Sequence, residues 1–143
     1  MALRKSTKLH KIKKVKSIIK EDISKVDKKY KTTYKDIKMY FTMINELVFD
    51  NKLSPFNKVL IKQLRHKTEK IYGQVLTYDW DRTGAREYQL HMIPYYKNKK
   101  DFACTLAHEM VHLYQMANEG DTGNHNQLFY SYRSKLNKIG LDL

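Results

Sequence analysis

The most informative stretch of this sequence is DFACTLAHEMVHLYQMA, residues 101–117. Apolar residues recur along it at steps of three and four, which predicts a helix with one buried side. That side is expected to carry Phe102, Leu106, Met110, Leu113 and Ala117. His108 and His112 are four residues apart, so their imidazoles project from one face of the helix and can bind a single metal ion.

Glu109 follows the first of these histidines and suits the chemistry of a hydrolase. The pattern His-Glu-x-x-His on a helix is typical of zinc enzymes in which the two histidines bind the metal and the glutamate is the general base. The metal lowers the pKa of a bound water, and the carboxylate takes its proton and passes it to a leaving amine. The alternative interpretation is a pair of surface histidines beside an ordinary glutamate.

A catalytic zinc ion needs three protein ligands and one open position, so a third ligand is expected after His112. A metzincin arrangement is excluded, because it requires glycine and histidine where the sequence has Gln115 and Asn118. His125 is the preferred third ligand, since it follows a glycine-containing loop at the start of the last predicted helix. The remaining candidates are Glu119 and Asp121. We therefore expect one Zn²⁺ per chain.

Helices and strands surround this stretch in an order typical of an α+β domain. A helix is predicted from Thr33, which can cap it with Asp36 in the capping-box position, to about residue 50. Its buried face is expected to carry Ile37, Tyr40, Phe41, Ile44, Leu47 and Val48. Three strands are expected over residues 59–64, 71–80 and 87–93, the last two joined by a hairpin turn at 81–84. A final helix over residues 126–139 would bury Leu128, Phe129, Tyr132 and Leu136.

Positive charge is concentrated at the start of the chain. Lys and Arg number 28 against 15 Asp and Glu, and residues 1–38 alone carry a net charge of +10 out of +13. An amphipathic helix is predicted from about residue 10 to residue 28, with the apolar residues Ile12, Val15, Ile19, Ile23 and Val26. This helix can pack on the domain, follow a phosphate backbone, or order only on binding. We therefore divide the chain into a partly helical basic arm, residues 1–32, and a domain, residues 33–143.

A basic arm favours a polyanionic partner, and nucleic acid is the common one inside a cell. The residues expected to contact it are Lys5, Lys8, Lys11, Lys13, Lys14 and Lys16. The alternative is a solvated leader that aids solubility. Since the single Cys104 excludes an intramolecular disulfide and neither a secretory signal nor a membrane-spanning run is evident, we expect a soluble, cytoplasmic protein without a membrane partner.

The motif HEMVH of residues 108–112, followed by GNH of residues 123–125 and by Phe129, resembles the SprT/Spartan family of zinc metalloproteases. Upstream, MYFTMINELVFDNKL of residues 39–53 is similar to the helix that precedes the sheet in that family. The order of helices and strands also agrees, so the resemblance covers about residues 37–143.

The resemblance implies a small zincin-like domain in which helices pack on a three-stranded, mainly antiparallel sheet. It implies that His108, His112 and His125 bind zinc and that Glu109 is the catalytic base. It also implies protein substrates attached to or bound at DNA, generally with DNA as activator. The chain departs from the family in having Asn126-Gln127 where Gly-Pro is usual, and in lacking the cysteine pairs of a zinc ribbon. DNA contact would then fall to the basic arm, and so short a lysine-rich form suggests a phage or other mobile-element origin.

Several other residues have two interpretations each. Cys104 either lies near the metal or, as we prefer, packs in the core. His91 either lines a substrate groove or is half-buried in its strand. Donors for a transition-state oxyanion are sought among Tyr95, Tyr96, Tyr130 and Tyr132. On the hairpin, Tyr78 and Trp80, close to Arg82 and Arg86, either stack on unpaired bases or, as we prefer, are core and rim residues of the sheet.

Three functions are compatible with these features. The leading hypothesis is a zinc endopeptidase that acts on proteins near nucleic acid. The alternative is a nucleic-acid-binding protein with a structural zinc site and little or no proteolysis. A hydrolase of another amide, such as cell-wall peptide, is the third, and the absence of an export signal argues against it.

Overall fold

The structure is a computed structural model that describes the backbone of residues 2–66, 69–80 and 82–143 and the side chains of residues 11–65, 70–80 and 82–143. Its central element is α3 (Lys99–Asn118), which confirms the predicted helix. The side-chain oxygen of Asn98 caps it by accepting from the backbone N–H of Asp101 at 2.8 Å.

Helix α3 is covered on several sides, so more of it is buried than a single apolar stripe predicts. The buried residues beyond that stripe include Ala103, Ala107, Val111 and Tyr114. Ala117, predicted to be buried, is exposed instead, because it lies in the last turn of α3, just before the helix ends at Asn118.

Helix α2 (Tyr34–Val48) confirms the second predicted helix. The Thr33 hydroxyl caps it by accepting from the backbone N–H of Asp36 at 3.1 Å. Its apolar face packs against α3, where the rings of Tyr40 and Phe102 meet edge to face with centroids 5.6 Å apart.

The main sheet has the strand order β2-β6-β5. Strands β5 (Gly73–Asp79) and β6 (Arg86–Met92) form the predicted antiparallel hairpin. Its turn is closed by a bond of 2.9 Å from the Gly84 N–H to the Trp80 carbonyl, and the φ of +67° at Gly84 requires a residue that tolerates the left-handed region. Strand β2 (Lys58–Ile61) runs parallel to β6.

The sheet is therefore mixed, and the prediction of a mainly antiparallel sheet was wrong for β2. The chain makes an excursion through β3 (Arg65–His66) and β4 (Glu69–Lys70) and then runs along β5 before it enters β6. Strands β2 and β6 consequently point the same way. A two-stranded antiparallel sheet of β1 (Tyr30–Lys31) and β7 (Tyr95–Tyr96) lies beside the start of α3.

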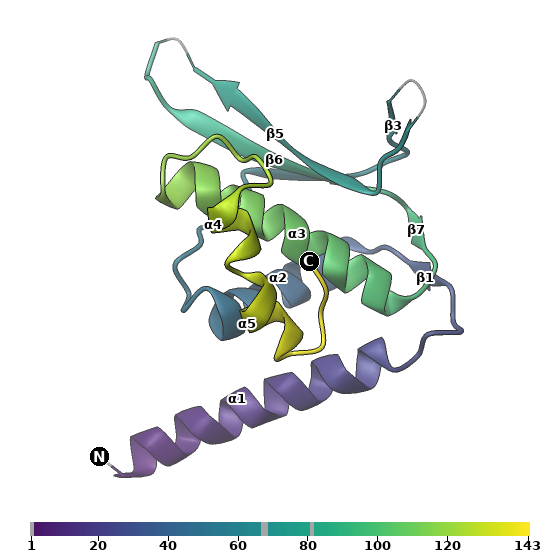
Figure 1. Ribbon diagram of the computed structural model, residues 1–143, viewed down its shortest axis with the longest axis vertical. Helices are drawn as coiled ribbons and strands as arrows, with labels where there is room; N and C mark the ends of the chain where they lie inside the picture. The colour runs from purple at the N-terminus through teal and green to yellow at the C-terminus, as the bar shows by residue number, and fades with distance from the viewer. Residues whose placement is uncertain (1, 67–68, 81) are drawn as a thin grey trace.

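Helix α1 (Ala2–Ile23) lies on the side of α3 opposite the main sheet (Figure 1). Its side chains Val15 and Ile19 are buried in the common core, so α1 packs on the domain. Asp22 anchors its end by pairing with Lys99 at 3.2 Å. The helix stops at Ile23, earlier than predicted, and the chain continues in turns, with the Ser24 hydroxyl donating to the Glu21 carbonyl at 2.6 Å.

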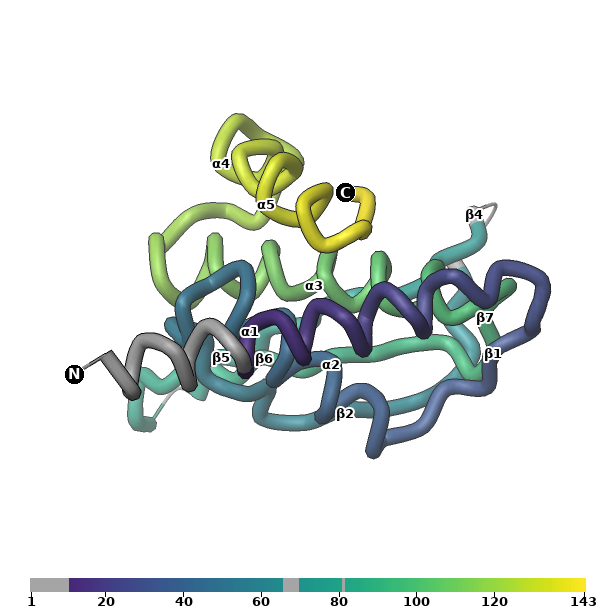
Figure 2. Tube along the Cα trace, turned by 90° about the horizontal axis from the view of Figure 1, so that it is seen from below, coloured from purple at the N-terminus to yellow at the C-terminus, as the bar shows by residue number. Residues whose placement is uncertain are grey.

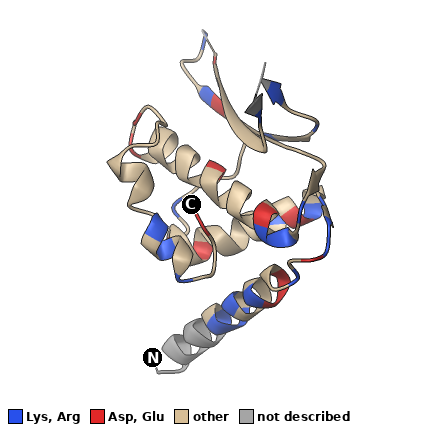
Figure 3. Ribbon diagram, turned by 45° about the vertical axis from the view of Figure 1, so that its right-hand side comes forward, with Lys and Arg blue, Asp and Glu red and all other residues tan. Residues whose placement is uncertain are grey.

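One expectation about the basic arm is corrected by the structure. Val26, predicted to lie on the apolar stripe, is beyond the helix and 49% exposed. The lysines on either side of Val15 are exposed, and those with described side chains include Lys11, Lys13, Lys14 and Lys16. The positions of these lysines along α1 are blue in Figure 3. The side chains of Lys5 and Lys8 lie outside the described residues.

The last predicted helix is two short helices, α4 (Gln127–Tyr130) and α5 (Arg133–Asn137). The helix is broken at Ser131, whose hydroxyl donates to the Leu128 carbonyl at 2.6 Å and whose backbone N–H is shared among several carbonyls. Phe129, Tyr132 and Leu136 are buried as predicted, and Leu128 is half-buried. Figure 2 shows α4 and α5 on one side of α3 and α2 on the other. Within the described ranges, no helix has the length and apolarity to cross a bilayer.

Candidate metal centre

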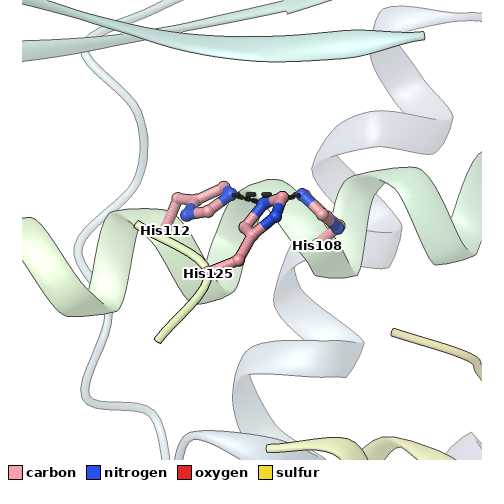
Figure 4. Close-up of side chains that lie close together, drawn as sticks. All are labelled: His108, His112 and His125. Carbon is pink, nitrogen blue, oxygen red and sulfur yellow. Dashed lines mark hydrogen bonds between the residues drawn. The ribbon is translucent and has the colours of Figure 1, made fainter. Parts of the chain in front are cut away.

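Three histidines meet beside the middle of α3. His108 and His112 project from one face of the helix, and His125 approaches them from the loop before α4 (Figure 4). The Nε2 atom of His112 lies 3.1 Å from that of His108 and 3.2 Å from that of His125, and the third pair is 3.2 Å apart. The structure thus brings together the three residues predicted as ligands.

The spacing of the three Nε2 atoms suits ligands of one zinc ion better than it suits hydrogen bonds among the three histidines. Two imidazoles bound tetrahedrally to zinc at about 2.0–2.1 Å have their nitrogens about 3.3–3.4 Å apart, close to the separations of 3.1–3.2 Å found here. Three mutual contacts cannot all be hydrogen bonds, because each neutral Nε2 carries either a proton or a lone pair and two of the three must be alike. A cation accepting all three lone pairs removes that conflict.

The protonation of the histidines favours the same conclusion. Burial, with the neighbouring imidazoles of His112 and His125, lowers the pKa of His108 to about 4. Burial also lowers the pKa of His112. Both are therefore neutral near pH 7, and neutral imidazole is the form that binds a metal.

Glu109 lies in the same turn of α3 and is only 6% exposed. Burial raises the pKa of its carboxyl to about 8, so a nearby positive charge is needed to keep it ionised at neutral pH. Together with His108 it lines a cleft of about 400 Å³. The other walls are the segment before and at the start of β5, the first half of α3 and the last residues of the chain: Ile71, Tyr72, Gly73, Cys104, Thr105, Asp142 and Leu143.

Gly73 brings the start of β5 directly onto α3 at this cleft, a role that sequence reasoning missed. A Cβ atom there would lie 2.8 Å from Cγ2 of Thr105 and 3.5 Å from Cγ of Glu109. No pattern in the sequence marks this glycine, because its need arises only when the strand meets the helix.

Gly73→Ala is expected to destabilise the protein by about 1–3 kcal/mol, because the added methyl overlaps Thr105 in a packed interface. Urea unfolding of the metal-free protein measures the effect. The matched test is the double variant Gly73→Ala/Thr105→Ser, which removes Cγ2 and keeps the hydroxyl that bonds to the Asp101 carbonyl. It should recover most of the loss, and a double variant as unstable as Gly73→Ala alone would contradict the proposed contact.

The alternative third ligands are engaged elsewhere. The Glu119 carboxylate accepts from the Tyr114 hydroxyl at 2.7 Å. The Asp121 carboxylate accepts from the Asn126 amide at 2.8 Å and from the Thr122 N–H at 2.7 Å. Neither belongs to the histidine cluster found among the described residues.

Cys104 and His91, the weaker candidates for the metal site and the substrate groove, both lie outside the histidine cluster. Cys104 packs against the core, as preferred, with its Sγ accepting from the Asp142 N–H at 3.3 Å, and it lines the cleft without joining the histidines. His91 is buried in β6 rather than half-buried, and its Nδ1 lies 3.1 Å from Nε2 of Gln74. It is not among the residues that line the cleft.

Of the four tyrosines considered as oxyanion donors, Tyr130 contacts the cluster, with its ring centroid 6.5 Å from that of His125. Tyr96 and Tyr132 are buried, and Tyr95 is exposed beside Lys29. On the hairpin, Tyr78 and Trp80 are 47% and 56% exposed, which excludes core positions and agrees with rim positions. Arg86 pairs with Asp79 at 2.6 Å, and Arg82 is exposed.

No protein-family model, curated protein or solved structure matches the chain. The class of the protein is therefore given by its own features. It is an α+β domain in which two histidines of the central helix meet a third from the loop before α4, with a buried glutamate in the adjoining cleft.

Proposed function

We propose that this chain is a zinc-dependent endopeptidase of small, zincin-like architecture. The observation that carries the proposal is that the Nε2 atoms of His108, His112 and His125 lie 3.1–3.2 Å from one another. Glu109, which follows His108 in the chain, is buried beside them and lines the cleft. Three histidines leave one position of a tetrahedral ion free, which is typical of catalytic rather than structural zinc sites. The resemblance of the HEMVH motif to SprT/Spartan proteases supports the same function.

Zinc bound there would lower the pKa of a water and polarise a substrate carbonyl. Glu109 would accept a proton from the attacking water as the water oxygen adds to the carbonyl carbon, and would return it to the amine nitrogen as the C–N bond breaks. The cleft wall that contains Gly73 is the start of β5, the outer strand in the order β2-β6-β5. An extended peptide can add to such a strand edge, which favours a polypeptide as substrate.

The substrates we propose are proteins associated with DNA. Lys11, Lys13, Lys14 and Lys16 are exposed along α1 while Val15 and Ile19 hold the helix on the core. Exposed lysines on both flanks of a helix held on the core suit a phosphate backbone. Nucleic-acid binding with a structural zinc and little proteolysis remains the second candidate, supported by these same lysines.

Replacing Lys11, Lys13, Lys14 and Lys16 with glutamine is expected to weaken binding to single-stranded DNA and to flatten its salt dependence. If all four contact phosphates, the slope of log K against log salt falls by about 3, at ~0.7 per contact. Fluorescence anisotropy over a salt series measures it. The matched control removes the same charge from exposed lysines elsewhere, at Lys52, Lys58, Lys97 and Lys138. Equal effects of the two sets would show that α1 is no specific contact surface.

The proposed activity is tested on a basic DNA-binding protein, incubated with the zinc-loaded chain with and without single-stranded DNA. Cleavage products identified by mass spectrometry, lost on chelation and restored by zinc, are the expected result. A chain shown to hold zinc that cleaves neither this substrate nor itself would favour the binding role.

A further inference from the structure

Gln115 is a buried amide whose two ends both have partners. It lies on α3 three residues after His112, so it shares that side of the helix, and it is 0% exposed. A buried glutamine is uncommon unless its donors and acceptor are satisfied, and here each end contacts a different part of the metal centre.

The oxygen end of Gln115 contacts a metal-site histidine. Its Oε1 lies 2.9 Å from Nδ1 of His112. An amide oxygen can only accept a hydrogen bond, so Nδ1 must carry the proton and donate it. The Nε2 atom of His112 is then left with a lone pair directed at the other two histidines.

The nitrogen end of Gln115 decides which way the amide points. Its Nε2 donates to the backbone carbonyl of Asn124 at 2.8 Å and to Oδ1 of Asn126 at 3.0 Å, with Oδ2 of Asp121 at 3.4 Å. The Asn124 carbonyl can only accept, and Asn126 Oδ1 also accepts from the Phe129 N–H at 3.1 Å. The reversed amide would place oxygen against these acceptors, so the orientation is determined by the network.

The two residues held by this nitrogen flank His125. Asn124 precedes it and Asn126 follows it, so one side chain both orients His112 and fixes the loop that delivers the third histidine. The Asp121 N–H adds a bond of 2.7 Å to the backbone carbonyl of Gln115, which ties the same loop to the end of α3.

We propose that Gln115 is a positioning residue of the metal centre, which selects the Nδ1–H form of His112 and fastens the His125 loop to α3. The inference rests on the proposed zinc site, but the selection of the His112 tautomer is a property of the protein without metal. Outer partners of histidine ligands commonly account for 10- to 100-fold in metal affinity, and here one residue serves two ligands. Gln115→Leu, which loses both contacts, should therefore weaken zinc binding by about 100-fold, and Gln115→Glu, which keeps an oxygen for His112, by about 10-fold.

The two variants remove different parts of the network. Gln115→Leu removes both the contact with His112 and the hydrogen bonds to the His125 loop. Gln115→Glu keeps an oxygen for His112 but sets a carboxylate against the Asn124 carbonyl and Asp121, so the loop is released while the tautomer is kept. The matched control is Gln63→Leu, the same change at an exposed glutamine between β2 and β3.

Two measurements separate failure of the inference from failure of the proposed function. Two-bond ¹H–¹⁵N spectra of the zinc-free protein report the histidine tautomers, and zinc affinity is measured by competition with a chromophoric chelator. We expect the Nδ1–H form for His112 in the parent and in Gln115→Glu, its loss in Gln115→Leu, and weaker zinc binding in both. A parent that binds no zinc would defeat the proposed function. A parent that binds zinc but shows the Nε2–H form at His112, or a folded Gln115→Leu with parental affinity, would overturn the inference.

Discussion

Glu109→Gln is expected to lower the rate of peptide cleavage by about 10²–10⁴-fold while zinc remains bound. The amide has nearly the shape of the carboxylate but cannot take a proton from water. The three histidines that hold the metal are unchanged, so metal content should stay at one zinc per chain. Cleavage rate and zinc content measured on the same preparation give the two values needed.

The matched control is Glu119→Gln, the same change at an exposed glutamate just beyond α3. Glu119 accepts from the Tyr114 hydroxyl and lies outside the histidine cluster, so its replacement should leave turnover within a few-fold of the parent. Since Glu119 was also an alternative third ligand, loss of zinc in Glu119→Gln would revive that assignment. A Glu109→Gln protein that cleaves as fast as the parent would refute the proposed general base.

His125→Ala is expected to weaken zinc binding by more than about 100-fold, beyond the 10- to 100-fold effect of outer partners, because it deletes a direct ligand. The remaining pair, His108 and His112, would still lie together on α3 and bind the metal weakly. Because bound metal stabilises only the folded state, the gain in melting temperature on adding zinc should also shrink. Competition with a chelator and thermal unfolding with and without zinc measure the two effects.

Asn124→Ala provides the control for His125→Ala. Its side chain is exposed, and the contact that Asn124 makes with Gln115 is through the backbone carbonyl, which the substitution keeps. The control should therefore bind zinc like the parent. Parental affinity in His125→Ala would mean that the third ligand lies elsewhere.

Local signals account for the parts of the fold that sequence reasoning predicted. Helices α2 and α3 have strong periodicity, and α2 has a capping residue that can be recognised in the sequence, Thr33. The β5–β6 hairpin has a turn that needs a glycine. The parallel pairing of β2 depends on the path of the chain through β3 to β5, and the break between α4 and α5 falls within a continuous apolar periodicity, so neither appears in an apolar pattern.

The candidate site divides in the same way. His108, Glu109 and His112 form a motif within one helix, and His125 followed from the chemistry of a catalytic zinc site. Gly73 acts only through a segment distant in the sequence, so nothing in its neighbours marks it, and the loop that Gln115 contacts exists only in the folded chain. A polar residue one turn after the second histidine, on the buried side of the helix, is the signal that would have found Gln115.

Zinc X-ray absorption on the loaded protein is the decisive measurement of whether His108, His112 and His125 hold a zinc ion with one open position. We expect three imidazole nitrogens and one further light atom at about 2.0–2.1 Å, with one imidazole lost in His125→Ala. A sulfur at about 2.3 Å, which would implicate Cys104, or a spectrum unchanged by His125→Ala, would contradict it.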